Sequence, residues 1–268
     1  EQAGIRHPRG CLFLLKDGGC GSIIKMVLED RGMEKVMAEN VMENIGENLE
    51  KLKIKIYDIL GIDITEAATL WPEIGAIFEG ISMIANASNT KKLHDALRAL
   101  SKNENIEKSL NELYGYVSNE ERALYVSTAF RKIILSNSKI AAAIIGLMLG
   151  EIKLENREFN NDDAILFNAL ETMTDFDIRN FKSIMEGDFI ATDNTGRQYF
   201  DVSLFPDDKR EDYLLTLTFG ERNRILSSFH QTLKDGKIQF STFYQTNKFS
   251  DILLKYINKV NQIINYGI

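Results

Sequence analysis

The sequence predicts a mainly α protein with a smaller α+β region at its C-terminal end. Apolar residues recur every three or four positions over long stretches, which is the period of amphipathic helices. The chain has three prolines in 268 residues, so few of these helices need to be interrupted. Short alternating segments beside turn residues are found after Glu155, and there we expect strands.

The composition is that of a globular protein and limits its partners. Apolar residues make up 44% of the chain and charged residues 26%, which is typical of a folded chain. The formal charge of −7 argues against bulk affinity for nucleic acid or anionic membranes. The segment from Leu217 to the end is an exception, because it has seven Lys or Arg against three Asp or Glu.

Cysteine use and hydropathy predict a cytoplasmic protein. Cys11 and Cys20 are the only cysteines, so no disulfide framework supports the fold. No segment approaches the roughly 18–20 uninterrupted apolar residues that span a bilayer, so we expect no integral membrane insertion.

The first 32 residues differ from the rest of the chain. They begin at Glu1 without a methionine and contain Gly21-Ser22, which resembles a cloning scar. We expect residues 1–32 to be a leader or a cloning-derived segment. The alternative is a native loop that includes Cys11 and Cys20.

Residues 33–155 are predicted to form a helical domain. Its first helix starts near Met33, carries apolar residues every four positions, and ends at Gly61. Ser118 and Glu121 form the pattern of a capping box at the start of another helix. Apolar stripes predict further helices at Glu73–Ala87, around Leu93–Leu100, at Ile106–Tyr116, at Glu120–Ser136 and at Lys139–Leu154.

One helix has a face of small residues. Ala142, Gly146 and Gly150 recur at four-residue spacing, which allows the backbone of a neighbouring helix to approach closely. We expect a buried hairpin helix here, and a membrane role is the alternative.

Residues 156–268 are predicted to form an α+β domain. Its elements are expected to be helices at Asp162–Met173 and Asp175–Met185, strands at Phe189-Ile190 and Tyr199–Leu204 around a turn with Gly196, a helix at Glu221–Lys234, a strand at Lys237–Tyr244 and a final helix from Phe249.

This order of elements resembles a winged-helix domain. The local match covers Arg222–Ile257, with the helix ERNRILSSFHQTLKDG, the strand KIQFSTFY and the turn Thr246–Ser250 before DILLKYI. Ser250 departs from the pattern, because winged-helix regulators have a glycine at that position. The resemblance implies a C-terminal winged-helix-like module with a recognition helix at Glu221–Lys234.

If the module binds DNA, that helix supplies the contacts. Arg and Asn pair with base edges, and Lys neutralises phosphate. The candidate nucleic-acid-binding residues are Arg222, Asn223, Arg224, Ser227, His230, Gln231 and Lys234, with Lys237 and Lys248 beside the wing. A protein-docking or dimerisation wing is the other interpretation, since many winged helices bind proteins only.

A second resemblance covers Trp71–Met185. The segments WPEIGAIFEGISMIAN, SNSKIAAAIIGLMLGEI and DAILFNALETMTDFDIRNF are similar in pattern to uncharacterised helical proteins of bacteria and mobile elements, some of them linked with phage defence. This resemblance implies no particular activity.

The final helix has an apolar stripe that suits a dimer interface. The candidate interface residues are Ile252, Tyr256, Val260 and Ile263. Burial of the same stripe against the helical domain is the alternative.

No catalytic motif is found, and we expect neither an enzyme, nor a metal site, nor a cofactor. The histidines His7, His94 and His230 lie far apart, and no HExxH or CxxC pattern is present. The sequence therefore favours a non-enzymatic bacterial interaction or regulatory protein with a protein partner or self-association. A DNA-binding transcriptional regulator and a membrane-active phage-defence effector are the alternatives.

Overall fold

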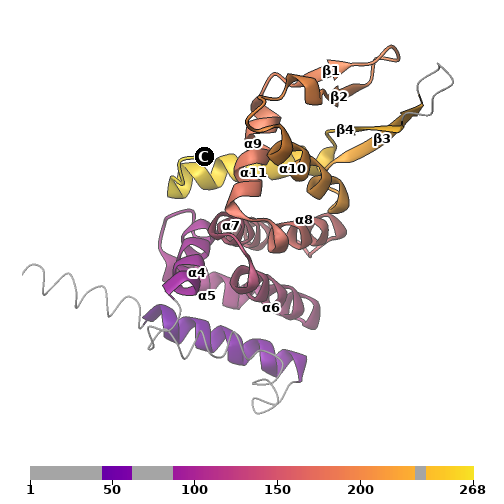
Figure 1. The fold of residues 1–268 in the computed structure, drawn as a ribbon. Helices are drawn as coiled ribbons and strands as arrows, with labels where there is room; N and C mark the ends of the chain where they lie inside the picture. Colours follow the sequence, from indigo (N-terminus) through magenta and orange to yellow (C-terminus); the bar gives the residue numbers. More distant parts are fainter. Residues whose placement is uncertain (1–43, 62–86, 233–239) are drawn as a thin grey trace, which may run out of the picture. The chain divides into compact units, whose positions relative to one another are not determined.

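The fold is mainly helical, with a small four-stranded antiparallel sheet in the C-terminal region, and this confirms the predicted fold class (Figure 1). The computed structural model describes residues 44–61, 87–232 and 240–268. The predicted leader, the helix at Glu73–Ala87 and the lysines Lys234 and Lys237 lie outside these residues.

The described residues of the helical part form one helix over residues 44–60 and four more, α4 to α7. Gly61 adopts φ +64° directly after the first of these, where a left-handed residue ends a helix. The bounds are Ala87–Leu100 for α4, Ile106–Tyr116 for α5, Glu120–Leu135 for α6 and Lys139–Glu155 for α7. The predicted capping box at Ser118 is wrong, because the side chain of Asn119 accepts the N–H of Arg122 and forms the N-cap of α6.

Helix α7 is the central core element. All residues from Ile140 to Ile145 are fully buried, and α7 contacts α4, α6, α8, α9 and α11 (Figure 1). Gly146 and Gly150 lie against the backbone of α4: a Cβ atom would lie 2.2 Å from the carbonyl oxygen of Ala96 at the first and 2.4 Å from that of Leu100 at the second. The predicted close approach of a neighbouring helix is therefore confirmed, and that helix is α4.

The C-terminal region alternates helices with two β-hairpins. Its elements are α8 Asn161–Thr172, α9 Asp175–Glu186, β1 Ile190–Thr192, β2 Gln198–Phe200, a 3-10 helix Val202–Leu204, α10 Arg210–Arg222, β3 Ser227–Thr232, β4 Phe240–Gln245 and α11 Lys248–Ile264. The strand order is β1-β2-β4-β3. Strand β4 pairs with β3 over six residues but with β2 only at Phe200 and Tyr244.

The predicted helix at Glu221–Lys234 is wrong. Helix α10 ends at Arg222, and the chain reverses through Arg224, whose φ is +63°. The N–H groups of Ile225 and Leu226 both donate to the carbonyl of Gly220, at 2.8 and 3.0 Å. These two apolar residues are buried in the turn and form no helical stripe, so the following residues pair with β4 instead.

Residues Ile45–Ile268 form one compact unit. Within it, α7 contacts helices on both sides of the predicted domain boundary at residue 155, and that boundary stays a prediction. Among the described residues, no helix has the length and apolar character needed to cross a membrane.

Candidate docking interface

The C-terminal sheet has one buried face and one partly exposed face. Phe200 and Tyr244 point inward and are 2% and 8% exposed. The hydroxyl groups of Tyr244 and of Thr218 on α10 lie 2.9 Å apart and share a hydrogen bond, so this face of the sheet is fixed to α10. Because side chains alternate along a strand, the neighbours of these residues lie on the opposite face.

That opposite face carries a cluster of three aromatic rings, here called the aromatic face: Tyr199 of β2, Phe229 of β3 and Phe243 of β4. The rings of Phe229 and Phe243 are stacked with centroids 5.3 Å apart, and Tyr199 meets Phe243 edge-on at 4.9 Å. Phe229 and Phe243 are direct cross-strand partners. All three side chains are partly exposed. Aromatic residues are enriched at protein interfaces compared with the rest of the surface. Three adjacent, partly exposed rings therefore favour a binding surface.

An arginine borders the aromatic face. The guanidinium carbon of Arg197 lies 4.8 Å from the centroid of Phe229, which is cation–π geometry. Its Nε donates to Thr195 at 3.0 Å and lies 3.3 Å from Asp193. The Asp193 carboxylate accepts hydrogen bonds from the Thr195 hydroxyl and from the backbone N–H of Arg197. These hydrogen bonds hold the pKa of Asp193 below its usual value. These contacts build the turn between β1 and β2, where Gly196 has φ +81°, at the bend that the sequence predicts.

A shallow notch lies beside Tyr199, where β2 and β4 separate. It is lined by Ile190, Gln198, Tyr199, Phe200, Gln245 and Thr246. Gln245 is partly exposed, and its amide has no hydrogen-bond partner among the described residues. The Gln245 amide therefore lies at the Tyr199 end of the aromatic face, and the Arg197 guanidinium lies over Phe229.

The predicted nucleic-acid-binding residues around the end of α10 divide into two groups. Arg222 and Arg224 are exposed and form no ion pair with any residue that the structure describes. Asn223 is the C-cap of α10 and donates its amide to the carbonyl of Phe219 at 3.0 Å. Ser227 accepts a hydrogen bond from the Asn247 amide at 3.3 Å. Of these four residues, Arg222 and Arg224 are the two whose side chains have no partner among the described residues.

The other predicted residues do not come together on one helix. His230 and Gln231 lie on β3, although the description does not extend to their side chains. Lys248 starts α11, and its ammonium is paired with Asp162 of α8 at 2.8 Å. Part of the basic charge in the last fifth of the chain is therefore neutralised within the fold.

Sequence reasoning missed most of the aromatic face. Phe229 falls within the predicted helix Glu221–Lys234, and Tyr199 is not singled out from the sequence. The alternation in residues 240–245 was the available signal, because it separates Phe243 from the buried Tyr244. This alternation does not show which other rings lie beside Phe243, because that depends on the register between β4 and β3.

Two of the four predicted dimer residues make contacts inside the fold. Val260 is fully buried, and the Tyr256 hydroxyl donates to Glu151 of α7 at 3.1 Å. Ile252 and Ile263 are partly exposed. The intramolecular alternative therefore accounts for Tyr256 and Val260, and self-association through Ile252 and Ile263 stays a prediction.

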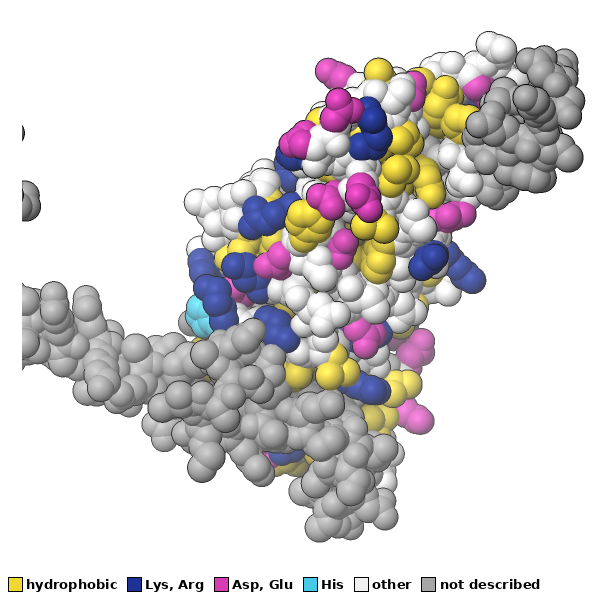
Figure 2. All heavy atoms as spheres, in the orientation of Figure 1, with side chains coloured by type: hydrophobic (Ala, Val, Ile, Leu, Met, Phe, Trp, Pro, Cys, Tyr) yellow, Lys and Arg dark blue, Asp and Glu magenta, His cyan; other side chains and the backbone are white. Residues whose placement is uncertain are grey.

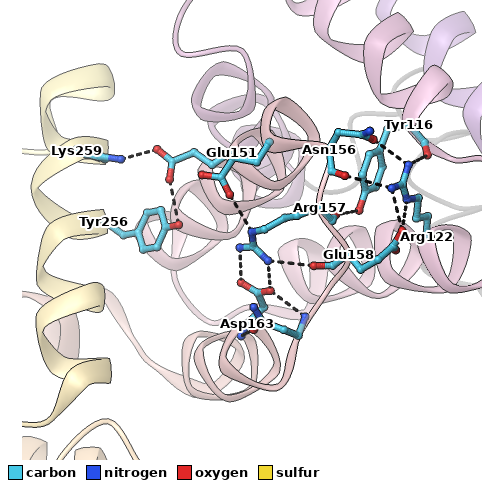
Figure 3. A network of polar contacts seen from close by, with 11 residues as sticks. Tyr116, Arg122, Glu151, Asn156, Arg157, Glu158, Asp163, Tyr256 and Lys259 are labelled. Atoms are coloured by element: carbon cyan, nitrogen blue, oxygen red, sulfur yellow. Dashed lines mark hydrogen bonds and ion pairs between the residues drawn. The ribbon is translucent and has the colours of Figure 1, made fainter.

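A polar network joins the C-terminal region to the helical part (Figure 3). Glu151 accepts hydrogen bonds from Tyr256 and from Lys259 of α11. Burial raises the pKa of Glu151, but these contacts more than offset burial and leave that pKa lowered. Beyond α11, the Tyr266 hydroxyl donates a hydrogen bond of 2.7 Å to the Asp95 carboxylate of α4. The C-terminal segment is therefore hydrogen-bonded to both α7 and α4.

The loop between α7 and α8 completes this network. Arg157 binds Asp163 through two hydrogen bonds of 2.6 and 2.9 Å (Figure 3). Arg122 lies over the ring of Tyr116 at 4.6 Å and donates to Asn156 at 2.9 Å. These groups satisfy one another, which indicates that the network positions the helices.

The described residues contain no group of three or more His, Cys, Asp or Glu side chains placed to hold a metal ion. A cleft of about 250 Å³ lies where the end of α4, the start of α5 and the end of α7 meet, and it is lined partly by Lys102, Lys108 and Lys153. The buried Lys153 is paired with Glu112 at 2.7 Å, so this cleft offers no free buried charge to a ligand.

The visible surface is mixed in charge. Figure 2 shows that both basic and acidic side chains lie on the face drawn. A face of mixed charge gives little long-range attraction for duplex DNA.

Comparison with protein-family models, with curated proteins and with solved structures gave no match for this chain.

Proposed function

We propose that the chain is a non-enzymatic bacterial interaction or regulatory protein whose C-terminal sheet docks onto a macromolecular partner. The observation that carries the proposal is the aromatic face, where Tyr199, Phe229 and Phe243 remain partly exposed although the opposite face of the sheet is buried. The helices around α7 form the body that holds this surface. Large, rigid aromatic side chains of this kind are the residues that most often dominate binding energy at interfaces.

The attachment of the elements beside the sheet supports this function. The Tyr244 hydroxyl of β4 is hydrogen-bonded to Thr218 of α10, and α11, which follows β4, is tied to α8 and α7 through Lys248–Asp162 and Tyr256–Glu151. A surface that is ordered before binding loses little conformational freedom on binding, which favours affinity.

Site-specific photo-crosslinking in the native host tests the proposal. A benzoylphenylalanine at position 243 is expected to give one discrete adduct, and the same group at Phe176, an exposed ring on α9, is expected not to give it. Excess purified wild-type chain should suppress the adduct, whereas the double variant Tyr199→Leu, Phe229→Leu should not. Equal adducts at both positions, or equal suppression by both competitors, would show that the sheet is not the docking surface.

A sequence-specific DNA-binding regulator is the second candidate. The observation that favours it is the exposure of Arg222 and Arg224 without ion pairs, next to the β3–β4 hairpin. It predicts that duplex DNA binds with a steep salt dependence, measured by fluorescence anisotropy at two salt concentrations. Charge reversal at both arginines should abolish that binding while circular dichroism stays unchanged. Retained binding would remove this candidate.

The membrane-active alternative receives less support from α7. Its residues from Ile140 to Leu149 are buried against the surrounding helices, so α7 reaches a lipid surface only if the core opens. Such opening would expose the large apolar area that stabilises the fold.

A further inference from the structure

The aromatic face combines the three kinds of side chain that hold unpaired bases. Tyr199, Phe229 and Phe243 provide ring faces and edges within 4.9 to 6.2 Å of one another. Arg197 lies over the ring of Phe229, and the Gln245 amide lies at the notch beside Tyr199. Bases stack on aromatic rings and on guanidinium planes, and amides hydrogen-bond to base edges.

The charge around this face is complementary to a phosphate backbone at a few points. Arg197 is 55% exposed, and its contacts within the chain are made through Nε, so its two terminal nitrogens have no partner among the described residues. Arg222 and Arg224 are exposed just before β3 begins, and β3 carries Phe229. One arginine, Arg197, therefore lies over the Phe229 ring of β3, and two more, Arg222 and Arg224, lie just before β3.

We propose that the aromatic face binds single-stranded nucleic acid, with bases stacked on Phe229, Phe243 and Tyr199 and phosphates paired with Arg197, Arg222 and Arg224. This rests on the proposed function, because it names the occupant of the same docking surface. A single strand fits better than a duplex, since rings set in a sheet reach only bases that are already unstacked.

The overall charge of −7 limits the expected affinity for a nucleic acid. Bulk attraction is absent, so affinity must come from stacking and from about three phosphate contacts. For a single strand each contact contributes about 0.7 to the logarithmic salt slope, so we expect a slope of about −2. Loss of one stacking ring should weaken binding about 5-fold to 100-fold.

The test is a fluorescence anisotropy titration of the full chain with labelled 15-nucleotide oligothymidylate and oligouridylate, and with a 15-base-pair duplex. We expect at least one single strand to bind more tightly than the duplex. Phe243→Leu and Arg197→Gln should each weaken that binding at least 5-fold. Phe176→Leu, which removes a 53% exposed ring elsewhere, should leave it unchanged. Circular dichroism of each variant verifies the fold.

Three results would overturn the inference: no binding of either single strand at low salt, tighter binding of the duplex, or equal losses for Phe176→Leu and Phe243→Leu. A proteinaceous adduct at position 243 with no oligonucleotide binding would mean that a protein occupies the face. In that case the inference fails and the proposed function stands. The absence of both adduct and oligonucleotide binding would refute both.

Discussion

The contact between α4 and α7 gives the sharpest stability prediction. Replacing Gly146 by alanine puts a Cβ 2.2 Å from the Ala96 carbonyl oxygen and 2.8 Å from the Ala96 Cα. An ordinary contact needs at least 3.4 Å, so the two backbones must separate by about 1 Å. The obstacle is backbone, which cannot rotate away as a side chain does.

The expected magnitude follows from two opposing effects. Overpacking a core costs about 1–3 kcal/mol, and a clash with backbone belongs at the upper end of that range. Alanine regains about 1 kcal/mol over glycine in a helix interior. We therefore expect Gly146→Ala to lower the free energy of unfolding by about 2 kcal/mol.

Gly115→Ala is the matched control. Gly115 is exposed on α5, and nothing lies within 4 Å of its added Cβ. The same substitution should therefore raise the free energy of unfolding by about 0.5 kcal/mol through helix propensity alone.

The assay is urea unfolding of both variants and the wild type, followed by circular dichroism at 222 nm. Thermal midpoints should move in the same directions, by about 2–4 °C per kcal/mol. If Gly146→Ala is as stable as the wild type, α4 and α7 do not pack as closely as described. If both variants are destabilised alike, the steric argument is wrong.

Three further predictions concern buried polar groups. Tyr125→Phe should be neutral or stabilise the fold by about 1 kcal/mol, because the Tyr125 hydroxyl is buried without a partner among the described residues; a loss in urea unfolding would contradict this. Arg157→Met should destabilise by about 3 kcal/mol, because it removes the counter-ion of the buried Asp163 carboxylate and leaves it only the N–H of Asn160 as a partner in the described part of the chain; a change below 0.5 kcal/mol would show that the pair contributes little. The pKa of Glu151 is lowered in the fold, so its contribution to stability is complete above the ordinary value of 4.5 and is lost as pH falls through the lower, folded pKa. Unfolding at pH 7 and at successive values below 4.5 should show this loss in the wild type, and Glu151→Gln should reduce it.

Local spacing along the sequence is enough to predict most of the helices among the described residues. Periodic apolar residues predict α5, α6, α7, α8 and α9 to within a residue or two, because a buried stripe on a helix needs only local spacing. The small residues of α7 likewise predict a close helix contact, because a glycine has no Cβ atom to keep the two backbones apart. Caps were less certain, as Asn119 shows, because several polar residues near a helix start compete for the same N–H groups.

The region after α9 depends on contacts between segments that lie far apart in the sequence. Residues 225–232 contain an apolar pattern that suits a helix, yet Ile225 and Leu226 fill the end of α10 and the rest pairs with β4. A strand is stabilised by its cross-strand neighbours, which lie far along the chain and are invisible to local spacing. The aromatic face depends on the same pairing, because Tyr199, Phe229 and Phe243 become neighbours only when the register of three strands is set.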